Sequence, residues 1–484
     1  MDGLDHLVKL IAFVKRDGLN NAFEQDLHYG GDVENVNFRA YPEPLRSLRH
    51  CLEESKLCME ALNSVKTGLA QKIRNLQKCC TPLVLEDGIQ RIPDEILAHI
   101  FEAGHQMLPQ SDSKFAIRVS HVSSRFRQVS LRIPLLWTRL SSDHPVDQIE
   151  AYLSRSCQSD LQVTIFEVSG HPDDKFRSAV QLMGPHSGRW STLHLIVDPD
   201  SLGIIDEAVS THFPRLRSIY HQWNLVPSSL GWDMPSLSRF EGYCSQFPSG
   251  VAFPFLSQLT CVELCFVDYD DFDMTSLAEA LYRMSNLRNL SLDFENCEAA
   301  DDDEDTALEM PNPHSFPIES VTITLRDSVA ADVVTSLYEI LEYLTASRVD
   351  ISLLMRGDPH DLVMGAKLFH HASTVRLRIG LPCSLSLIIN ALYENCKTLQ
   401  TLQIEGSSFN PVAFVPSHWP QIPSLRHVQF YDCIMLEENV GPMATGLLTC
   451  EEFQLLEFIS CHKISEEYLL KLQDKFGERL TWSF

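Results

Sequence analysis

The chain has 484 residues, of which 44% are hydrophobic, so it can enclose sizeable cores and is too apolar for a disordered chain. Its formal net charge of −26 disfavours a nucleic-acid partner, because phosphate contacts need clustered Lys and Arg. No apolar stretch approaches the roughly eighteen residues of a membrane-spanning helix, so we expect no membrane partner either.

Residues 1–41 are predicted to hold one short amphipathic helix followed by a polar segment that contains Gly and Asn. Asp2 and Asp5 precede the apolar centre of that helix, and the charged residues 15–17 follow it, where a secretory signal would have a small-residue cleavage site. We therefore expect no export signal. Because the fourteen cysteines are scattered along a chain without such a signal, we interpret them as reduced thiols of a cytoplasmic or nuclear protein.

Residues 42–82 show a heptad pattern, which predicts a long helix. Eight of its ten core positions are apolar over about four and a half heptads, a length at which a coiled coil is a fair interpretation. Two interpretations stay open: a helix that self-associates or binds a partner, and a helix folded against its own chain. The first set of positions is Leu45, Leu52, Met59, Lys66 and Ile73, and the second is Leu48, Ser55, Leu62, Leu69 and Leu76.

Residues 83–141 contain three apolar clusters in succession. A first helix is predicted to begin at Pro93, whose missing N–H the first turn does not need. A second amphipathic helix follows a polar connection, and a third cluster closes the unit. This is more apolar surface than so small a domain encloses alone, which implies a partner surface. The clusters are Ile96, Leu97, Ile100 and Phe101; Phe115, Val119, Val122, Phe126 and Val129; and Ile133, Leu135, Leu136 and Trp137.

The same stretch resembles an F-box, most closely the F-box-like domains of proteins abundant in mushroom-forming fungi. The resemblance rests on Ile92-Pro93-Asp94-Glu95-Ile96-Leu97, Ile100-Phe101, Val119-Ser120-x-Val122-Ser123-x-x-Phe126 and Pro134-Leu135-Leu136-Trp137. Ser123 and Phe126 stand where that family usually has Cys and Trp. The resemblance implies a three-helix domain that docks on a Skp-type adaptor through Pro93, Ile96, Leu97, Ile100, Phe101, Val119, Val122 and Phe126. An ordinary small three-helix domain packed on the rest of the chain is the alternative.

Residues 142–484 repeat the pattern L-x-x-L-x-L at intervals of 20 to 30 residues, the period of leucine-rich repeats. Each unit is unable to bury its own apolar face, so stacking into a curved solenoid with a parallel sheet is expected. Clear copies begin at Leu287, Ile318, Leu399, Leu425 and Phe453, and looser ones lie at Leu193, Leu216, Leu237, Leu259 and Val375. Helices are predicted at Ile149–Ser156, Thr275–Met284, Val333–Thr345 and Ser384–Cys396, and early strands at Leu161–Ile165 and from Trp190.

Two cysteines in the last repeats occupy a position with a known structural role. Cys433 and Cys461 fall on the position where Asn or Cys normally bonds backbone groups after the strand. The last repeats, which end in the segment 459–465, closely resemble those of F-box proteins.

Two acidic stretches, Asp268–Asp273 and the region 298–314, are expected to interrupt the array. The second is predicted to be an exposed loop, which is either a contact for a basic partner or a solvated insertion.

The sequence offers no catalytic or metal-binding motif. Gly184–Gly188 fails as a nucleophile elbow, because two residues separate the first Gly from Ser187 and none separates Ser187 from the second. The closest cysteine pairs, Cys79-Cys80 and Cys261 with Cys265, lack a second pair at zinc-site spacing. We therefore expect no enzyme activity, no metal and no cofactor.

Together these features predict an α/β protein, with a long heptad helix and a three-helix F-box before a curved leucine-rich-repeat solenoid. The resemblance implies the substrate-recognition subunit of a Skp–cullin–F-box ubiquitin ligase, in which the adaptor connects to a cullin–RING ligase and the repeats hold an unidentified target protein. The alternative is a repeat scaffold that never joins a ligase, its F-box-like segment capping the solenoid. Exposure of the Ile96, Leu97, Ile100 and Phe101 stripe distinguishes the two.

Overall fold

The computed structural model describes most of the chain and divides it into two compact units, Met1–Leu97 and Ala98–Phe484. The described residues are 2–17, 42–109, 112–167, 173–222, 231–248, 250–251, 253–299, 315–355, 370–380, 382, 385–406, 408, 422 and 424–484. The polar segment predicted before residue 42 and the acidic loop beyond residue 299 lie outside this range.

The first unit contains the two helices predicted at the N-terminal end of the chain. Helix α1 (Asp2–Asp17) packs against α3 (Pro42–Gln90), and Leu7 of α1 is buried. The short amphipathic helix and the long helix are thus both confirmed, with α3 running past the predicted end at residue 82. Between Pro44 and Pro82 the helix contains no proline, so every residue in that stretch keeps its backbone N–H donor.

Three short helices lead into the sheet: α4 (Asp94–Met107), α5 (Phe115–Ser120) and α6 (Ser124–Leu131), followed by the 3₁₀ turn η2 (Pro134–Trp137). The division between the two units falls inside α4. The prediction of one continuous second helix was wrong, because the chain breaks between α5 and α6. The Ser123 hydroxyl caps α6 by accepting a hydrogen bond from the Phe126 N–H at 3.2 Å, and Ser favours such a cap over a helix interior.

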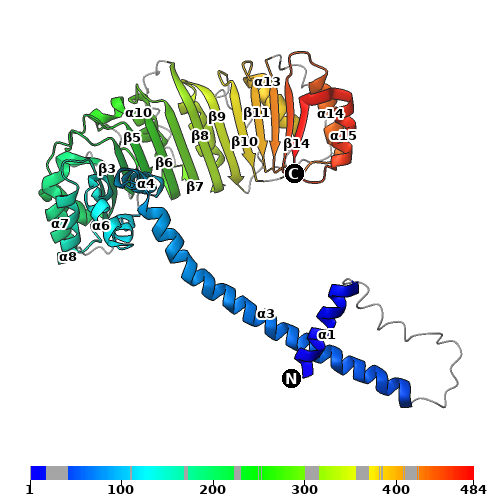
Figure 1. The fold of residues 1–484 in the computed structure, drawn as a ribbon. Coiled ribbons are helices and arrows are strands. Elements are labelled where there is room, and N and C mark those ends of the chain that lie inside the picture. The colour runs from blue at the N-terminus through cyan, green and yellow to red at the C-terminus, as the bar shows by residue number, and fades with distance from the viewer. Residues whose placement is uncertain are drawn as a thin grey trace. The chain divides into compact units, whose positions relative to one another are not determined.

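The second unit is organised by one fourteen-stranded sheet whose strands are all parallel and follow chain order (Figure 1). This is the predicted repeat architecture. The strands are β1 (Arg139–Ser141), β2 (Leu161–Glu167), β3 (Trp190–Val197), β4 (Ser218–Gln222), β5 (Arg239–Tyr243), β6 (Cys261–Phe272), β7 (Asn289–Ala299), β8 (Phe316–Val329), β9 (Leu344–Met355), β10 (Thr374–Ile379), β11 (Thr401–Glu405), β12 (His427–Tyr431), β13 (Leu455–Ile459) and β14 (Leu480–Ser483).

Helices and 3₁₀ turns connect the strands. The helices are α7 (Val146–Arg155), α8 (Asp174–Met183), α9 (Pro199–Ala208), α10 (Met274–Tyr282), α11 (Ala331–Leu341), α13 (Leu385–Asn395), α14 (Glu437–Leu448) and α15 (Glu466–Phe476). The 3₁₀ turns are η3 (Gly184–Arg189), η5 (Pro254–Gln258) and η8 (Gly477–Arg479). Alternate strand residues are buried and the others face away from the core, so the two faces of the sheet differ in burial.

The predicted apolar repeats form the core of the solenoid. Leu290 pairs with Val321 and Leu402 with Val428 in adjacent strands, and all four side chains are buried. Each repeat therefore places its apolar residues at the same level as those of its neighbours, and stacking buries a continuous core.

Two further sequence predictions in this unit were wrong. The helix predicted over Val333–Thr345 ends at Leu341, because Leu344 begins β9 and pairs with Phe316 of β8. The acidic stretch Asp268–Asp273 does not interrupt the array. It forms the end of β6, and the Asp273 carboxylate caps α10 by accepting the Ser276 N–H at 3.0 Å.

The turn after several strands has a recurring chemistry. Cys433 and Cys461 are buried, and their thiols donate to the carbonyls of Ile404 and Phe430 in the preceding strands, each at 3.4 Å. The predicted structural role of both cysteines is confirmed. Cys297, which the sequence reasoning overlooked, does the same toward Phe266 at 3.6 Å. The residue before each of the three cysteines has a positive φ near 50°, and these are Asn296, Asp432 and Ser460.

These environments predict a graded thiol reactivity. Burial raises the pKa of Cys297 and of Cys396 to about 11, so both thiols stay protonated and shielded at neutral pH. The thiols of Cys79, Cys80 and Cys157 are exposed. We expect iodoacetamide to alkylate the three exposed thiols in the native protein and the two buried thiols only after unfolding. Peptide mass spectrometry over a labelling time course checks this. Equal labelling rates would contradict the described packing.

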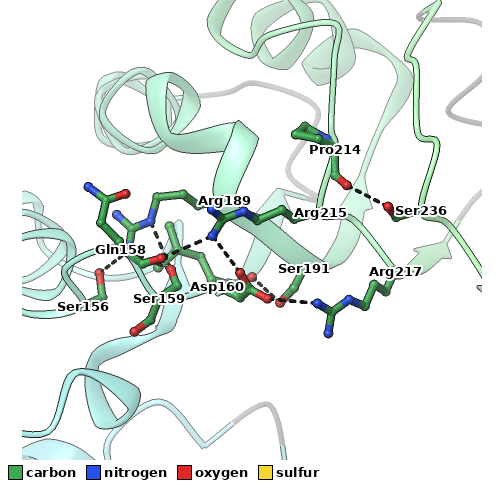
Figure 2. Close-up of polar contacts among 11 residues, drawn as sticks. Ser156, Gln158, Ser159, Asp160, Arg189, Ser191, Pro214, Arg215, Arg217 and Ser236 are labelled. Atoms are coloured by element: carbon green, nitrogen blue, oxygen red, sulfur yellow. Dashed lines mark hydrogen bonds and ion pairs between the residues drawn. The ribbon is translucent and has the colours of Figure 1, made fainter.

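A polar seam ties the first repeats together at the end of the sheet where strands begin (Figure 2). The Arg189 guanidinium donates to the Ser159 carbonyl at 2.9 Å and to the Ser156 hydroxyl at 2.9 Å, just beyond the end of α7. Asp160 accepts from Arg215 at 3.0 Å and from Arg217 at 3.4 Å, so one carboxylate links the segment before β2 to the segment before β4. These hydrogen bonds join the ends of the first repeats to one another.

Candidate functional site

Helix α4 presents one face to solvent and buries another. Ile96 and Ile100 are four residues apart on one side of the helix and are 51% and 50% exposed, whereas Leu97 and Phe101 are 3% and 4% exposed. Pro93, just before the helix, is also exposed. Large aliphatic side chains held half in water on a well-formed helix are typical of a surface that another protein covers.

The other predicted adaptor-binding residues lie on α5 and α6 and between them. The Phe101 and Phe126 rings pack with their centroids 5.0 Å apart, which brings α4 and α6 together. Val119 is buried in the same small core, whereas Val122, in the turn before α6, is 63% exposed. The eight predicted residues thus form two groups, an exposed one of Pro93, Ile96, Ile100 and Val122, and a buried or half-buried one of Leu97, Phe101, Val119 and Phe126.

Arg139 holds the carboxyl end of α4, a role that sequence reasoning missed. It is 5% exposed, and its guanidinium donates to the carbonyls of His105 at 2.8 Å, Pro109 at 2.9 Å and Leu108 at 3.2 Å, and to the Gln162 side chain at 3.1 Å. A cation at this end also complements the helix dipole. Because Arg139 begins β1, this contact fixes the end of α4 against the first repeats.

Close packing on both sides supports this arrangement. A Cβ at Gly104 would lie 2.9 Å from the Phe115 ring, so only glycine lets α5 approach α4 this closely. Trp137 is fully buried, and its indole N–H donates to the Ser130 carbonyl at 2.9 Å. The exposed face of α4 is therefore carried by a rigid support.

Burial gives this region an acid-sensitive histidine. Desolvation and the nearby Arg139 charge lower the pKa of His105 to about 4, and desolvation lowers the pKa of His221, a buried residue of strand β4, to about 4 as well. An unfolded histidine has a pKa near 6.5, so between pH 6.5 and 4 the unfolded chain binds more protons than the folded one. The free energy of unfolding is therefore expected to fall as the pH drops through this window and to be insensitive to these groups above it.

Substituting one of these histidines tests the effect. We expect the thermal midpoint of His105→Leu to fall less between pH 7.5 and 5 than that of the native chain, because one proton-binding group of the unfolded state is removed. His99→Leu is the matched control on the same helix, since the His99 side chain is 76% exposed. Differential scanning fluorimetry across the pH range measures both, and an equal pH dependence of His105→Leu and the native protein would contradict the assignment.

The solvent-facing side of the sheet is lined with paired charges. Arg239 donates to Glu241 at 2.7 Å and also pairs with Glu263 on the next strand. Arg376 and Arg378 both bind Glu405, and their hydrogen bonds outweigh burial, so the pKa of Glu405 lies below its usual value. Such pairs order the side chains on this face of the sheet.

The segment Gly184–Gly188 forms part of the 3₁₀ turn η3. Ser187 lies buried in η3, and its hydroxyl accepts the Ser210 N–H at 3.1 Å, as a structural residue does. Nowhere in the described part of the chain do three or more His, Cys, Asp or Glu side chains gather as metal ligands would. Among the helices within the described ranges, none has the length and apolar character needed to cross a bilayer.

Comparison with known proteins supports the description of the helical segment before the sheet. Residues 89–143 match the F-box-like family model. A solved structure of a leucine-rich-repeat protein from Leptospira interrogans is similar over 67% of this chain and 95% of that chain, at 10% identity and a TM-score of 0.27. No curated protein matches the chain. The resemblance to the fungal proteins stays a prediction.

Proposed function

Because an F-box-like domain precedes a leucine-rich-repeat-like parallel sheet here, we propose that the chain is the substrate-recognition subunit of a Skp–cullin–F-box ubiquitin ligase. The observation that carries the proposal is the exposed pair Ile96 and Ile100 on α4, together with the exposure of Pro93 and of Val122. These residues would enter the apolar surface of a Skp-type adaptor. Leu97, Phe101, Val119 and Phe126 would support them from below.

In this proposal the repeats bind a target protein on the solvent-facing side of the sheet. The ordered charge pairs at Arg239 and at Glu405 would give that surface its specificity. Ubiquitin transfer belongs to the cullin–RING partner. The chain contributes proximity, which raises the effective concentration of target lysines near the transfer machinery.

One observation favours the scaffold alternative. The buried Arg139 fastens α4 to the first strand, as an element that caps the solenoid would be fastened. A cap covers its apolar residues itself, however, and α4 leaves Ile96 and Ile100 half exposed. The ligase-subunit proposal therefore has the stronger support.

Reconstitution with purified partners tests the proposal. The full chain is mixed with a Skp-type adaptor and then with the adaptor-binding part of a cullin, and the mixture is separated by size-exclusion chromatography. The proposal expects a ternary complex that forms only when the adaptor is present. A chain that elutes apart from the adaptor at micromolar concentration would overturn the ligase role and leave the repeat scaffold.

A further inference from the structure

The heptad stripe of α3 is uncovered over most of its length. Its six large apolar residues between positions 52 and 76 are each 48% to 59% exposed, although α1 packs against the same helix. The residues are Leu52, Met59, Leu62, Leu69, Ile73 and Leu76. The helix does not fold this stripe against the described part of its own unit, so the stripe is a candidate for a second chain.

The area of the stripe suits a stable dimer. Half-exposed leucine, isoleucine and methionine side chains each leave roughly 100 Å² of apolar surface in water. Six of them on each of two chains would therefore bury about 1,200 Å², which reaches the lower limit of a stable protein–protein interface.

Ser55 and Lys66, the two polar residues that interrupt the stripe, indicate that the partner is a second copy of this chain. When two copies of α3 are laid antiparallel about a two-fold axis between Met59 and Leu62, Lys66 of each copy faces Ser55 of the other. The layers on either side are apolar: Met59 faces Leu62, and Leu52 faces Leu69. In a parallel pair Lys66 of one copy would face Lys66 of the other in the middle of the apolar stripe, and these like charges would repel. The stripe is thus complementary to itself in one orientation.

The net charge of this helix differs in sign from that of the whole chain. Residues 45–76 contain six Lys or Arg and three Glu, a net charge of +3 in a chain whose total is −26. Because both copies carry the same small positive charge here, net charge does not select this contact, and the pairing rests on the apolar stripe and on the alignment of Lys66 with Ser55. We propose that α3 mediates an antiparallel homodimer through the stripe defined above, with the remainder of each chain leaving the coiled coil at opposite ends.

The test is the oligomeric state of the full chain and needs no adaptor, so its outcome is independent of the ligase role. Sedimentation equilibrium from about 1 to 100 µM is expected to show a dimer. Leu62→Lys places two like charges near the two-fold axis and should raise the dissociation constant at least a hundredfold. Leu57→Lys is the matched control, since Leu57 is 41% exposed on the same helix but lies off the stripe. Circular dichroism confirms that both variants keep their helix.

A second substitution tests the orientation. Ser55→Glu would place a carboxylate opposite Lys66 twice in the antiparallel dimer and tighten it several-fold, most strongly at low salt. In a parallel dimer the new carboxylates would face each other and weaken it. A native chain that stays monomeric up to about 100 µM, or equal effects of Leu57→Lys and Leu62→Lys, would overturn the dimer. Weakening by Ser55→Glu would overturn the antiparallel orientation.

Discussion

The double variant Ile96→Asp/Ile100→Asp is expected to lose binding to a Skp-type adaptor while remaining folded. Both side chains are about half exposed, so aspartate at these positions stays in water in the free protein. In the complex two carboxylates would be buried against an apolar partner without hydrogen bonds, which costs several kcal/mol. Because a loss of about 4 kcal/mol raises a dissociation constant roughly a thousandfold, a micromolar complex would disappear. A pull-down with purified adaptor, quantified by biolayer interferometry, measures the loss.

The control for this experiment adds the same charges beside the proposed face. His99→Asp/Gln106→Asp places two carboxylates at exposed positions of α4 that lie roughly 80° to 100° around the helix from the isoleucine pair. We expect this variant to bind the adaptor within about threefold of the native chain, since surface substitutions usually change free energies by less than about 0.5 kcal/mol. If both double variants lose binding equally, general acidity of α4 would explain the loss and the assigned face would be wrong.

The variant Arg139→Met is expected to lower the stability of the F-box-like domain and first repeats by about 3 to 5 kcal/mol. The guanidinium satisfies three carbonyls at the end of α4 and one side-chain oxygen, and methionine leaves them without donors in a buried place. Arg139→Lys should recover only part of the loss, because one ammonium is unable to reproduce the fork of donors.

Hydrogen exchange of the α4 amides, together with the denaturant midpoint of the full chain, measures this effect. Arg132→Met is the matched control, since Arg132 is exposed on the turn after α6, and its change should stay within about 0.5 kcal/mol. Unchanged protection of α4 in Arg139→Met would show that the end of the helix is held by other contacts.

The two substitutions also separate binding from folding. The isoleucine variant should bind no adaptor with normal protection of α4, whereas Arg139→Met should lose protection first and binding as a consequence. If the F-box-like segment were only a cap on the solenoid, Arg139→Met would still destabilise the chain, but the isoleucine variant would have no effect in any binding assay. The pair of results therefore distinguishes the ligase subunit from the scaffold.

Much of the fold was predictable because its signals are local and repeated. The apolar positions around Leu290, Val321 and Leu402 recur at one spacing, and every copy independently indicates a strand with one buried face. Cys433 and Cys461 could be assigned from their place in that repeat. Errors arose where two signals competed, as at Ser123, where a capping hydroxyl outweighed a helical stripe, and at Leu344, where strand pairing outweighed helix continuation.

The sequence by itself determined the order of the parts, namely a heptad helix, an F-box-like stretch and a repeat solenoid. The reason is that the spacing of apolar residues along the chain shows which positions are buried in a helix or a strand. Only the tertiary structure decided which predicted contact residues face solvent, with Ile96 and Ile100 outside and Leu97 and Phe101 inside. It also decided that Arg139 is the link between α4 and the sheet. A single arginine forms no repeating pattern in the sequence, and the carbonyl groups to which it donates become its neighbours only when the chain folds.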